Sequence, residues 1–222
     1  MVKKLFVFLF RGALMLFQLA LLLVVLYRVL PVPITPLMLL RGGTIHKEWK
    51  PLHKISKQVP IAVFTSEDPN FLNHKGFDLK AIQKVLKDKQ KKENKRLRGA
   101  STVSQQTSKN VFLWPARSWL RKGLEVPLTS GIELFWTKRR IMEVYLNVIE
   151  MGSFVYGIEA AAQHYFKKSA QDLSRKEAAA IVSCFPNPRI YIANKPSRYI
   201  KKKQNRISRW MIGYEPLPDW WY

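Results

Sequence analysis

The chain of 222 residues has few side chains that cross-link a protein or bind a metal. Its only cysteine, Cys184, excludes an intramolecular disulfide and lies in an apolar run that is typical of a buried small side chain. Four histidines and one cysteine occur at no ligand spacing, so no zinc site built by the protein alone is visible. The sequence has no internal repeats.

Acidic residues are scarce as well. The chain holds 38 Lys and Arg against 15 Asp and Glu, a formal net charge of +23. Such an excess implies an anionic partner: nucleic acid, acidic lipid headgroups or a phosphate-bearing substrate. A hydrophobic content of 47% excludes a disordered chain. The length accommodates one domain of ordinary size plus an anchor.

Charge is absent from residues 12–27, between Arg11 and Arg28. This stretch is slightly shorter than the roughly 20 residues of a membrane-spanning helix. Both arginines can direct their charged ends to water, which extends the usable stretch to residues 5–30. Because the segment is apolar on every face, it favours lipid over a protein core.

Basic residues near the N-terminus indicate how this segment is oriented. Lys3, Lys4 and Arg11 favour a cytoplasmic N-terminus, and no small-x-small cleavage site follows. Prolines at positions 31, 33 and 36 indicate an extended connector. We therefore expect a cytoplasmic N-terminus and transmembrane signal-anchor in residues 1–30, a connector in 31–44 and one compact domain in 45–222.

Helical patterns predominate after residue 45, and the fold class we expect is all-α or mainly α. Residues 141–149 place apolar side chains, including Tyr145, on one stripe, which predicts an amphipathic core helix. Ser174 and Glu177 have the spacing of a capping box, and Ser197 can cap a last helix.

An acidic pair in this basic chain is the first candidate for chemistry. Glu67 and Asp68 follow the apolar residues 59–64. A carboxylate at the end of an apolar stretch is costly to desolvate, and such a setting suits a residue that handles protons. The alternative is an acid at a helix end that pairs with a nearby Lys or Arg.

Two further segments gather reactive side chains. Residues 99–110 offer hydroxyls, two amides and a lysine, which suit sugar hydroxyls and phosphate oxygens; alternatively they form a helix N-terminus capped by Ser101 or Thr102. In residues 117–125 three cations precede one acid. They could hold a diphosphate or form a basic helix face of no special role; these four residues are Arg117, Arg121, Lys122 and Glu125.

Taken in order, these segments resemble the motifs of the peptidoglycan glycosyltransferases, glycosyltransferase family 51. The chain has Glu-Asp-x-x-Phe-x-x-His-x-Gly-x-Asp at 67–78, Gly-Ala-Ser-Thr-x-x-Gln-Gln-x-x-Lys-Asn at 99–110 and Arg-Lys-x-x-Glu at 121–125. Residues 140–152 resemble the fourth motif and 177–188 the fifth. The resemblance spans about residues 55–212, and five motifs in order are highly specific.

The resemblance implies a lysozyme-like α fold whose cleft opens at the outer face of the bacterial inner membrane. The substrate would be lipid II, a disaccharide-peptide on an undecaprenyl diphosphate. Glu67 matches the general base, which would take the proton of the acceptor's 4-hydroxyl while the donor's anomeric carbon is attacked with inversion. Polymerisation would release undecaprenyl diphosphate.

The resemblance also assigns the other site residues. Lys109 and Arg117 match family residues that contact the diphosphate. Arg121 and Lys122 would add to the positive field around it. Glu125 matches the family's second acid, assigned either to a divalent cation (Mg²⁺ or Mn²⁺) at the diphosphate or to orienting the cations; no organic cofactor is implied. His74 and Asp78 would brace the loop of Glu67. The remaining expected substrate contacts are Ser101, Thr102, Gln105, Gln106 and Asn110.

Two other functions compete with this interpretation. A lysozyme-like hydrolase would also use an acid in an α-rich cleft, but it has no reason to direct four cations at that cleft. A non-catalytic binder of nucleic acid or anionic lipid fits the charge, but it leaves the acids unexplained. With no Ser-x-x-Lys in the chain, we expect a monofunctional enzyme without a transpeptidase domain. The expected partners are lipid II, the growing glycan strand, the lipid bilayer and cell-division or wall-synthesis proteins, but no nucleic acid.

Overall fold

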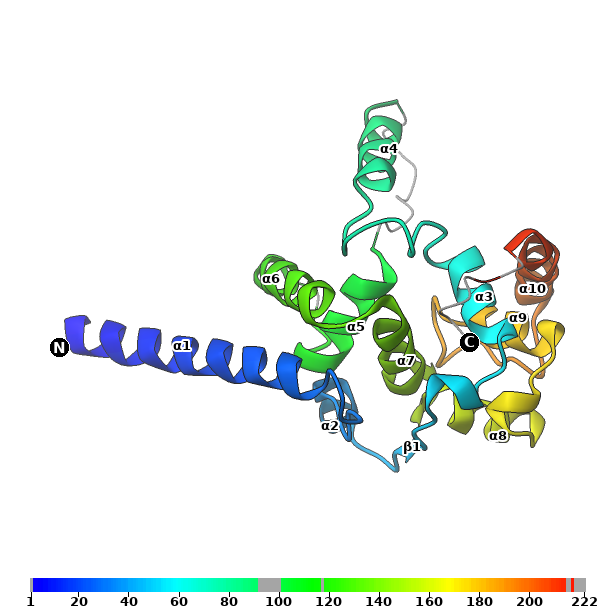
Figure 1. Ribbon diagram of the computed structural model, residues 1–222, viewed down its shortest axis with the longest axis horizontal. Helices are drawn as coiled ribbons and strands as arrows, with labels where there is room; N and C mark the ends of the chain where they lie inside the picture. Colours follow the sequence, from blue (N-terminus) through cyan, green and yellow to red (C-terminus); the bar gives the residue numbers. More distant parts are fainter. Residues whose placement is uncertain (1, 92–100, 117, 215–216, 218–222) are drawn as a thin grey trace.

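The computed structural model describes residues 2–91, 101–116, 118–214 and 217, and it is mainly helical, as predicted (Figure 1). A long first helix, α1 (Val2–Leu26), projects from the body formed by the other elements. Short 3-10 turns are η1 (Leu52–Lys54), η2 (Ala170–Asp172) and η3 (Met211–Tyr214). The remaining helices are α2 (Pro36–Arg41), α3 (Gln58–Ser66), α4 (Leu79–Lys91), α5 (Val103–Phe112), α6 (Trp119–Phe135), α7 (Lys138–Val148), α8 (Ile158–Phe166), α9 (Arg175–Ser183) and α10 (Arg198–Trp210).

Serine and threonine side chains determine where many of these helices begin. Each accepts a hydrogen bond from the backbone N–H three residues later, a donor that the helix itself leaves unpaired. The predicted capping box of Ser174 and Glu177 and the predicted cap at Ser197 are both confirmed. The capping residues of α2, α5, α6, α7, α9 and α10 are Thr35, Thr102, Ser118, Thr137, Ser174 and Ser197.

Helix α7 lies in the core and confirms the amphipathic helix predicted there. Its Ile141, Val144 and Leu146 are fully buried. Helix α5 packs against both α6 and α7, while α9 packs against α3 and α10. Since each buried aliphatic side chain contributes about 1.5–3 kcal/mol, this packing fixes α5 and α7 relative to each other.

A small sheet closes one end of α7. Its strands are β1 (His46–Lys47), β2 (Glu150–Gly152) and β3 (Val155–Tyr156), in the order β1-β3-β2. β1 pairs with β3 in parallel, and β2 pairs with β3 antiparallel through an irregular register. Gly157 follows β3 at φ +81°, and a side chain there would lie 2.8 Å from the Asn147 carbonyl oxygen. The close approach of these two backbones therefore requires glycine.

The first helix has the properties of a membrane anchor. A candidate span covers Lys3–Leu26, and its side chains are almost all exposed. Its C-terminal part packs against α6, where the Trp136 indole N–H donates to the Val24 carbonyl at 2.6 Å. Helix α6 itself exposes large apolar side chains, among them Trp119 and Leu134. These features are consistent with a single N-terminal membrane anchor.

The expected extended connector is wrong in one part. Residues 36–41 form helix α2, because Thr35 caps its N-terminus and Pro36 takes the first helical position. Proline fixes φ at a value that suits a first helical turn as well as an extended chain, so the three prolines alone did not distinguish the two. Leu37 and Met38 of α2 are buried against Tyr156, which holds this helix on the body.

Candidate active site

Glu67 stands at the C-terminal end of α3. Residues 59–65 of this helix are buried, and the backbone N–H of Glu67 closes its last turn on the Val63 carbonyl at 2.8 Å. The carboxylate is half-buried and accepts a hydrogen bond from the Ser66 hydroxyl at 3.2 Å. Among the described residues no Lys or Arg pairs with it, so the alternative of a helix-end ion pair has no support there.

The neighbouring Asp68 is buried, and its hydrogen bonds hold the loop that follows Glu67. Its carboxylate accepts from the Val103 backbone N–H at 2.9 Å and lies 3.0 Å from His74 Nε2. Because His74 Nδ1 accepts from the Gly76 N–H, its Nε2 carries the proton and donates to Asp68. The contacts of His74 agree with the expected bracing role.

Asp78 fixes the far end of the same loop. It accepts from the Asn70 side-chain amide at 2.8 Å and from the Ala81 backbone N–H at 2.9 Å, so it caps α4. These two hydrogen bonds, the Asn70 one first, lower the pKa of Asp78 below its usual value. Asp68 and Asp78 thus hold the two ends of the loop that follows Glu67, while the Glu67 carboxylate itself stays available to a ligand.

Helix α5 separates the residues of the second motif into two groups. Thr102 and Gln105 form a capping box, and the Thr102 hydroxyl donates to the Gly76 carbonyl at 2.6 Å. Both side chains are buried and turned toward the helix start. Their proposed substrate contact stays a prediction. Ser101 is exposed at the chain entry to α5, and Arg117 lies outside the described residues.

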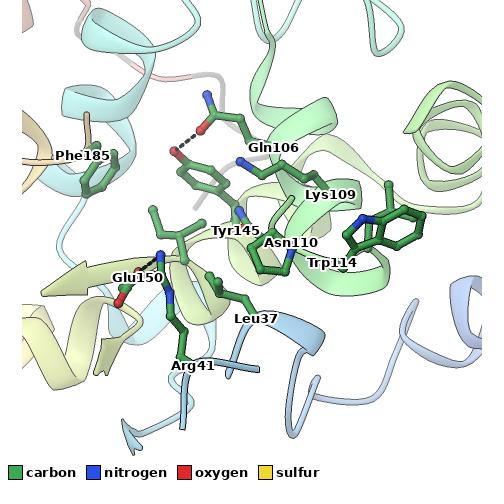
Figure 2. Close-up of a pocket in the computed structure, with 12 residues that line it drawn as sticks. Leu37, Arg41, Gln106, Lys109, Asn110, Trp114, Tyr145, Glu150 and Phe185 are labelled. Atoms are coloured by element: carbon green, nitrogen blue, oxygen red, sulfur yellow. Dashed lines mark hydrogen bonds and ion pairs between the residues drawn. The ribbon is translucent and has the colours of Figure 1, made fainter. Parts of the chain in front are cut away.

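Gln106, Lys109 and Asn110 lie on the other face of α5 and line a cavity of about 230 Å³ (Figure 2). The spacing i, i+3, i+4 places all three on one side of the helix. Across the cavity are Tyr145 of α7 and an ion pair between Arg41 of α2 and Glu150 of β2, at 3.3 Å. Apolar side chains complete the lining: Leu37, Leu113, Trp114, Pro115, Ile149 and Phe185.

Tyr145 connects this cavity to Glu67. Its hydroxyl donates to the Gln106 side-chain oxygen at 3.2 Å (Figure 2). Burial raises the pKa of Tyr145 well above its usual value, and the negative charges of Glu67 and Asp68 raise it further. The phenol therefore keeps its proton close to the candidate base. The predicted core position of Tyr145 is confirmed, because its side chain is fully buried. Its contact with Gln106 was missed; the signal that could have indicated it is that a buried tyrosine hydroxyl needs a polar partner.

Lys109 lines the cavity together with Arg41, which is paired with Glu150. Burial lowers the pKa of its ammonium; Glu125 raises it, and Arg121 and Lys122 lower it. Within the described part of the chain this ammonium forms no hydrogen bond or ion pair. A half-buried cation without a partner carries a desolvation cost, and an anionic ligand would reduce that cost.

Glu125 is buried in α6 and holds two cations. Its Oε2 accepts from Arg121 at 2.9 Å, and its Oε1 accepts from the Lys122 ammonium. Arg121 is further fixed by the Ala116 carbonyl at 2.6 Å. Glu125 and Glu67 do not line the cavity themselves; their charges raise the pKa of two residues that do, Lys109 and Tyr145 respectively.

The expected divalent cation at Glu125 fits these side chains poorly. Both carboxylate oxygens are taken by cations, and the described residues contain no group of three or more His, Cys, Asp or Glu side chains that could hold a metal. A Mg²⁺ ion prefers oxygen ligands and few positive neighbours. The other expectation, that Glu125 orients the cations of the site, agrees with the geometry.

Among the described residues, a carboxylate without an ion pair, two cations held by Glu125 and a cavity lined by Lys109 are the elements of an enzyme that transfers a group from an anionic leaving group. The transglycosylase family pattern matches residues 37–212, and the chain belongs to this family. It is 48% identical over 198 residues to a biosynthetic peptidoglycan transglycosylase of Pasteurella multocida, covering 85% of this chain and 80% of that protein.

Two further relatives have the same name. The Bdellovibrio bacteriovorus protein is 51% identical over 193 residues, covering 83% of this chain and 76% of its own length. The Haemophilus influenzae protein is 48% identical over 207 residues, covering 88% and 84%. In each case the match extends over most of both chains, and the predicted family resemblance is confirmed.

Proposed function

We propose that this protein polymerises peptidoglycan glycan strands from lipid II. The observation that supports this best is the cavity lined by Lys109 of α5 and by the hydrogen-bonded Gln106 and Tyr145, together with the Glu67 carboxylate at the end of α3, whose charge raises the pKa of Tyr145. Base and cation are what glycosyl transfer from a diphosphate needs. The names of the relatives agree with this substrate class.

Glu67 acts as the general base in this proposal. Its carboxylate takes the proton of the acceptor's 4-hydroxyl, and the oxygen attacks the donor's anomeric carbon. The carbon–oxygen bond to the diphosphate breaks, the configuration inverts, and undecaprenyl diphosphate leaves with the bonding electrons. General-base assistance of this kind contributes about 10²–10⁴-fold. The Ser66 hydroxyl bonded to Glu67 helps to orient it.

The leaving group is stabilised by the cations. Lys109 has an ammonium free to bind the diphosphate, and Arg121 and Lys122 are held nearby by Glu125. A preorganised group of this type contributes about 10²–10³-fold to the rate. Glu125 acts by positioning the cations. A divalent cation remains a proposal for the substrate complex only, in which the diphosphate would supply oxygen ligands, and no step here depends on it.

The proposed location follows from α1. A cytoplasmic N-terminus, with Lys3 and Lys4 inside, puts the catalytic body on the outer face of the inner membrane. There it meets lipid II in the bilayer. Cell-division or wall-synthesis proteins are the partners that we propose, together with the growing strand, and we propose no nucleic acid.

The test is polymer formation from purified lipid II in detergent by the wild type and Glu67→Gln. We expect polymer from the wild type and a loss of at least about 10²-fold in the variant, because the amide cannot take the proton. Glu48→Gln, on an exposed carboxylate away from the cavity, is the matched control. Digestion of finished glycan instead of polymer formation would favour a hydrolase. If neither activity is detected and the protein binds anionic lipid or nucleic acid in a salt-dependent way, the result would favour a non-catalytic binding protein.

A further inference from the structure

Helix α7 has a second polar face that takes no part in the cavity. Arg140, Glu143 and Asn147, at i, i+3 and i+7, lie on the side of α7 away from Tyr145. They belong to the segment that resembles the fourth motif, yet they do not line the cavity. Their partners are backbone groups far away in the sequence.

Arg140 binds the end of the anchor. Its Nε donates to the Tyr27 carbonyl at 3.0 Å, and one terminal nitrogen donates to the Leu30 carbonyl. The other terminal nitrogen pairs with Glu143. Carbonyls at the C-terminal end of a helix lack helical partners and carry partial negative charge, so a cation is well placed there.

Glu143 and Asn147 bind the segment that leads into the body. Glu143 accepts from the Leu52 N–H at 2.7 Å. The Asn147 side chain accepts from the Lys50 N–H and donates to the Lys50 carbonyl, both at 2.8 Å. Asn147 is fully buried, which makes these bonds costly to break.

Trp49 joins the two sets of contacts. The Arg140 guanidinium lies 5.2 Å from its ring centroid, and the Lys47 ammonium lies 5.6 Å from it. Lys47 also donates to the Val32 and Pro33 carbonyls at 2.5 and 3.0 Å. We call Arg140, Glu143, Asn147, Lys47 and Trp49 the anchor clasp.

We propose that the anchor clasp positions the catalytic cavity relative to the membrane, so that reaction with a membrane-embedded substrate depends on Arg140 although Arg140 touches no substrate. This inference rests on the proposed function for its substrate. The clasp joins the end of α1 to α7, and α7 presents Tyr145 to the cavity on its other side. Misplacement of reacting groups by about 1 Å can cost on the order of 10²-fold.

The geometry test uses the full chain in lipid nanodiscs. Spin labels at Leu22→Cys on α1 and Asn205→Cys on α10 report the distance between anchor and body; both positions are exposed, and Cys184 is buried. We expect one narrow distance distribution in the wild type. Arg140→Gln should broaden or shift it, because the variant loses the guanidinium bonds to the Tyr27 and Leu30 carbonyls and keeps only the α1–α6 packing with the Trp136–Val24 bond and the Lys47 bonds to the connector. Arg139→Gln is the control, since Arg139 has no contact among the described residues.

The kinetic test compares lipid II polymerisation in nanodiscs and in detergent micelles. We expect Arg140→Gln to lose about 10- to 100-fold in nanodiscs and clearly less in micelles, which impose no fixed plane. Arg140→Lys keeps the pairing charge but not the planar fork, so it should rescue only in part. An unchanged distance distribution would overturn the proposal, as would equal losses in both media with a lowered melting temperature. If the wild type makes no polymer, the proposed function fails, while the distance measurement still decides whether the clasp holds the anchor.

Discussion

At the scale of single residues, Glu67 and Asp68 differ in surroundings more than in chemistry. Asp68 has its oxygens occupied by His74 and the Val103 N–H, whereas Glu67 has one neighbouring hydroxyl. The sequence predicted that this pair mattered and identified Glu67 through the family resemblance. Which carboxylate remains free depends on contacts 35 residues apart in the chain, which no local pattern contains.

Lys109 gives a prediction for the pH profile. Because burial lowers its pKa, the ammonium loses its proton at a lower pH than an ordinary lysine does, and activity should fall earlier on the alkaline side. Lys109→Arg should move this alkaline limb to higher pH, since arginine stays charged. The measurement is kcat/KM for polymer formation between pH 7 and 10. An alkaline limb that is the same in both enzymes would contradict the role of Lys109.

Substitution of Tyr145, the core tyrosine of α7, gives a prediction for catalytic efficiency. Tyr145→Phe removes the hydroxyl that orients Gln106 but keeps the ring, so the fold should hold. The loss of one hydrogen bond, worth about 0.5–1.5 kcal/mol, should lower kcat/KM by up to about 10-fold. Steady-state kinetics with a thermal melt as control tests this. A collapse of the melting temperature with intact specific activity would instead make the hydroxyl structural.

At the scale of elements, Asp78 connects the active-site loop to α4 and gives a prediction for stability. Asp78→Ala should cost about 1 kcal/mol at pH 7, because α4 loses its cap. The pKa of Asp78 is lower in the folded state, so its stabilisation is complete above the unfolded value and disappears as pH falls through the folded value. The difference between wild type and variant should therefore shrink below about pH 4.

Urea unfolding in detergent at pH 7 and pH 3 measures this difference. Asp88→Ala is the control, since the Asp88 carboxylate is exposed on α4 and has no contact among the described residues. An equal effect of the two substitutions would show that cap geometry is not the cause.

The positions of most helices were predictable from the sequence, and the roles of their side chains were less so. Apolar periodicity identified α7, and spacing identified the caps of α9 and α10, because these signals are local. Helix α2 was missed because prolines suit extended and first-turn backbone alike. The predicted alternative that Thr102 caps a helix is confirmed, but the part that Gln105 plays in the capping box was not predicted, because it depends on where α5 starts. The expected substrate contact of these two residues stays a prediction.

At the scale of the whole molecule, the exposed apolar side chains of α1 and α6 give a prediction for contact with a bilayer. The Trp119 side chain is 92% exposed on α6, which packs beside the anchor. In nanodiscs made with brominated lipids, tryptophan fluorescence should be quenched, and Trp119→Phe should remove a measurable part of that quenching. Trp210→Phe on α10, far from α1 in Figure 1, should leave the quenched intensity unchanged. Equal quenching in the wild type and Trp119→Phe would place α6 away from the lipid.

Helix α7 makes contacts on two opposite faces, and this limits insertions and deletions within the helix. One added residue between Glu143 and Val144 would rotate everything beyond it by about 100° relative to the first turn of the helix. Tyr145 would then leave the cavity, and Asn147 would leave the Lys50 backbone, in a single event. A single substitution in α7 can affect one of these contacts and spare the other, whereas an insertion or deletion displaces both. Length variation among relatives should therefore accumulate in the loops around α7 and spare the helix itself.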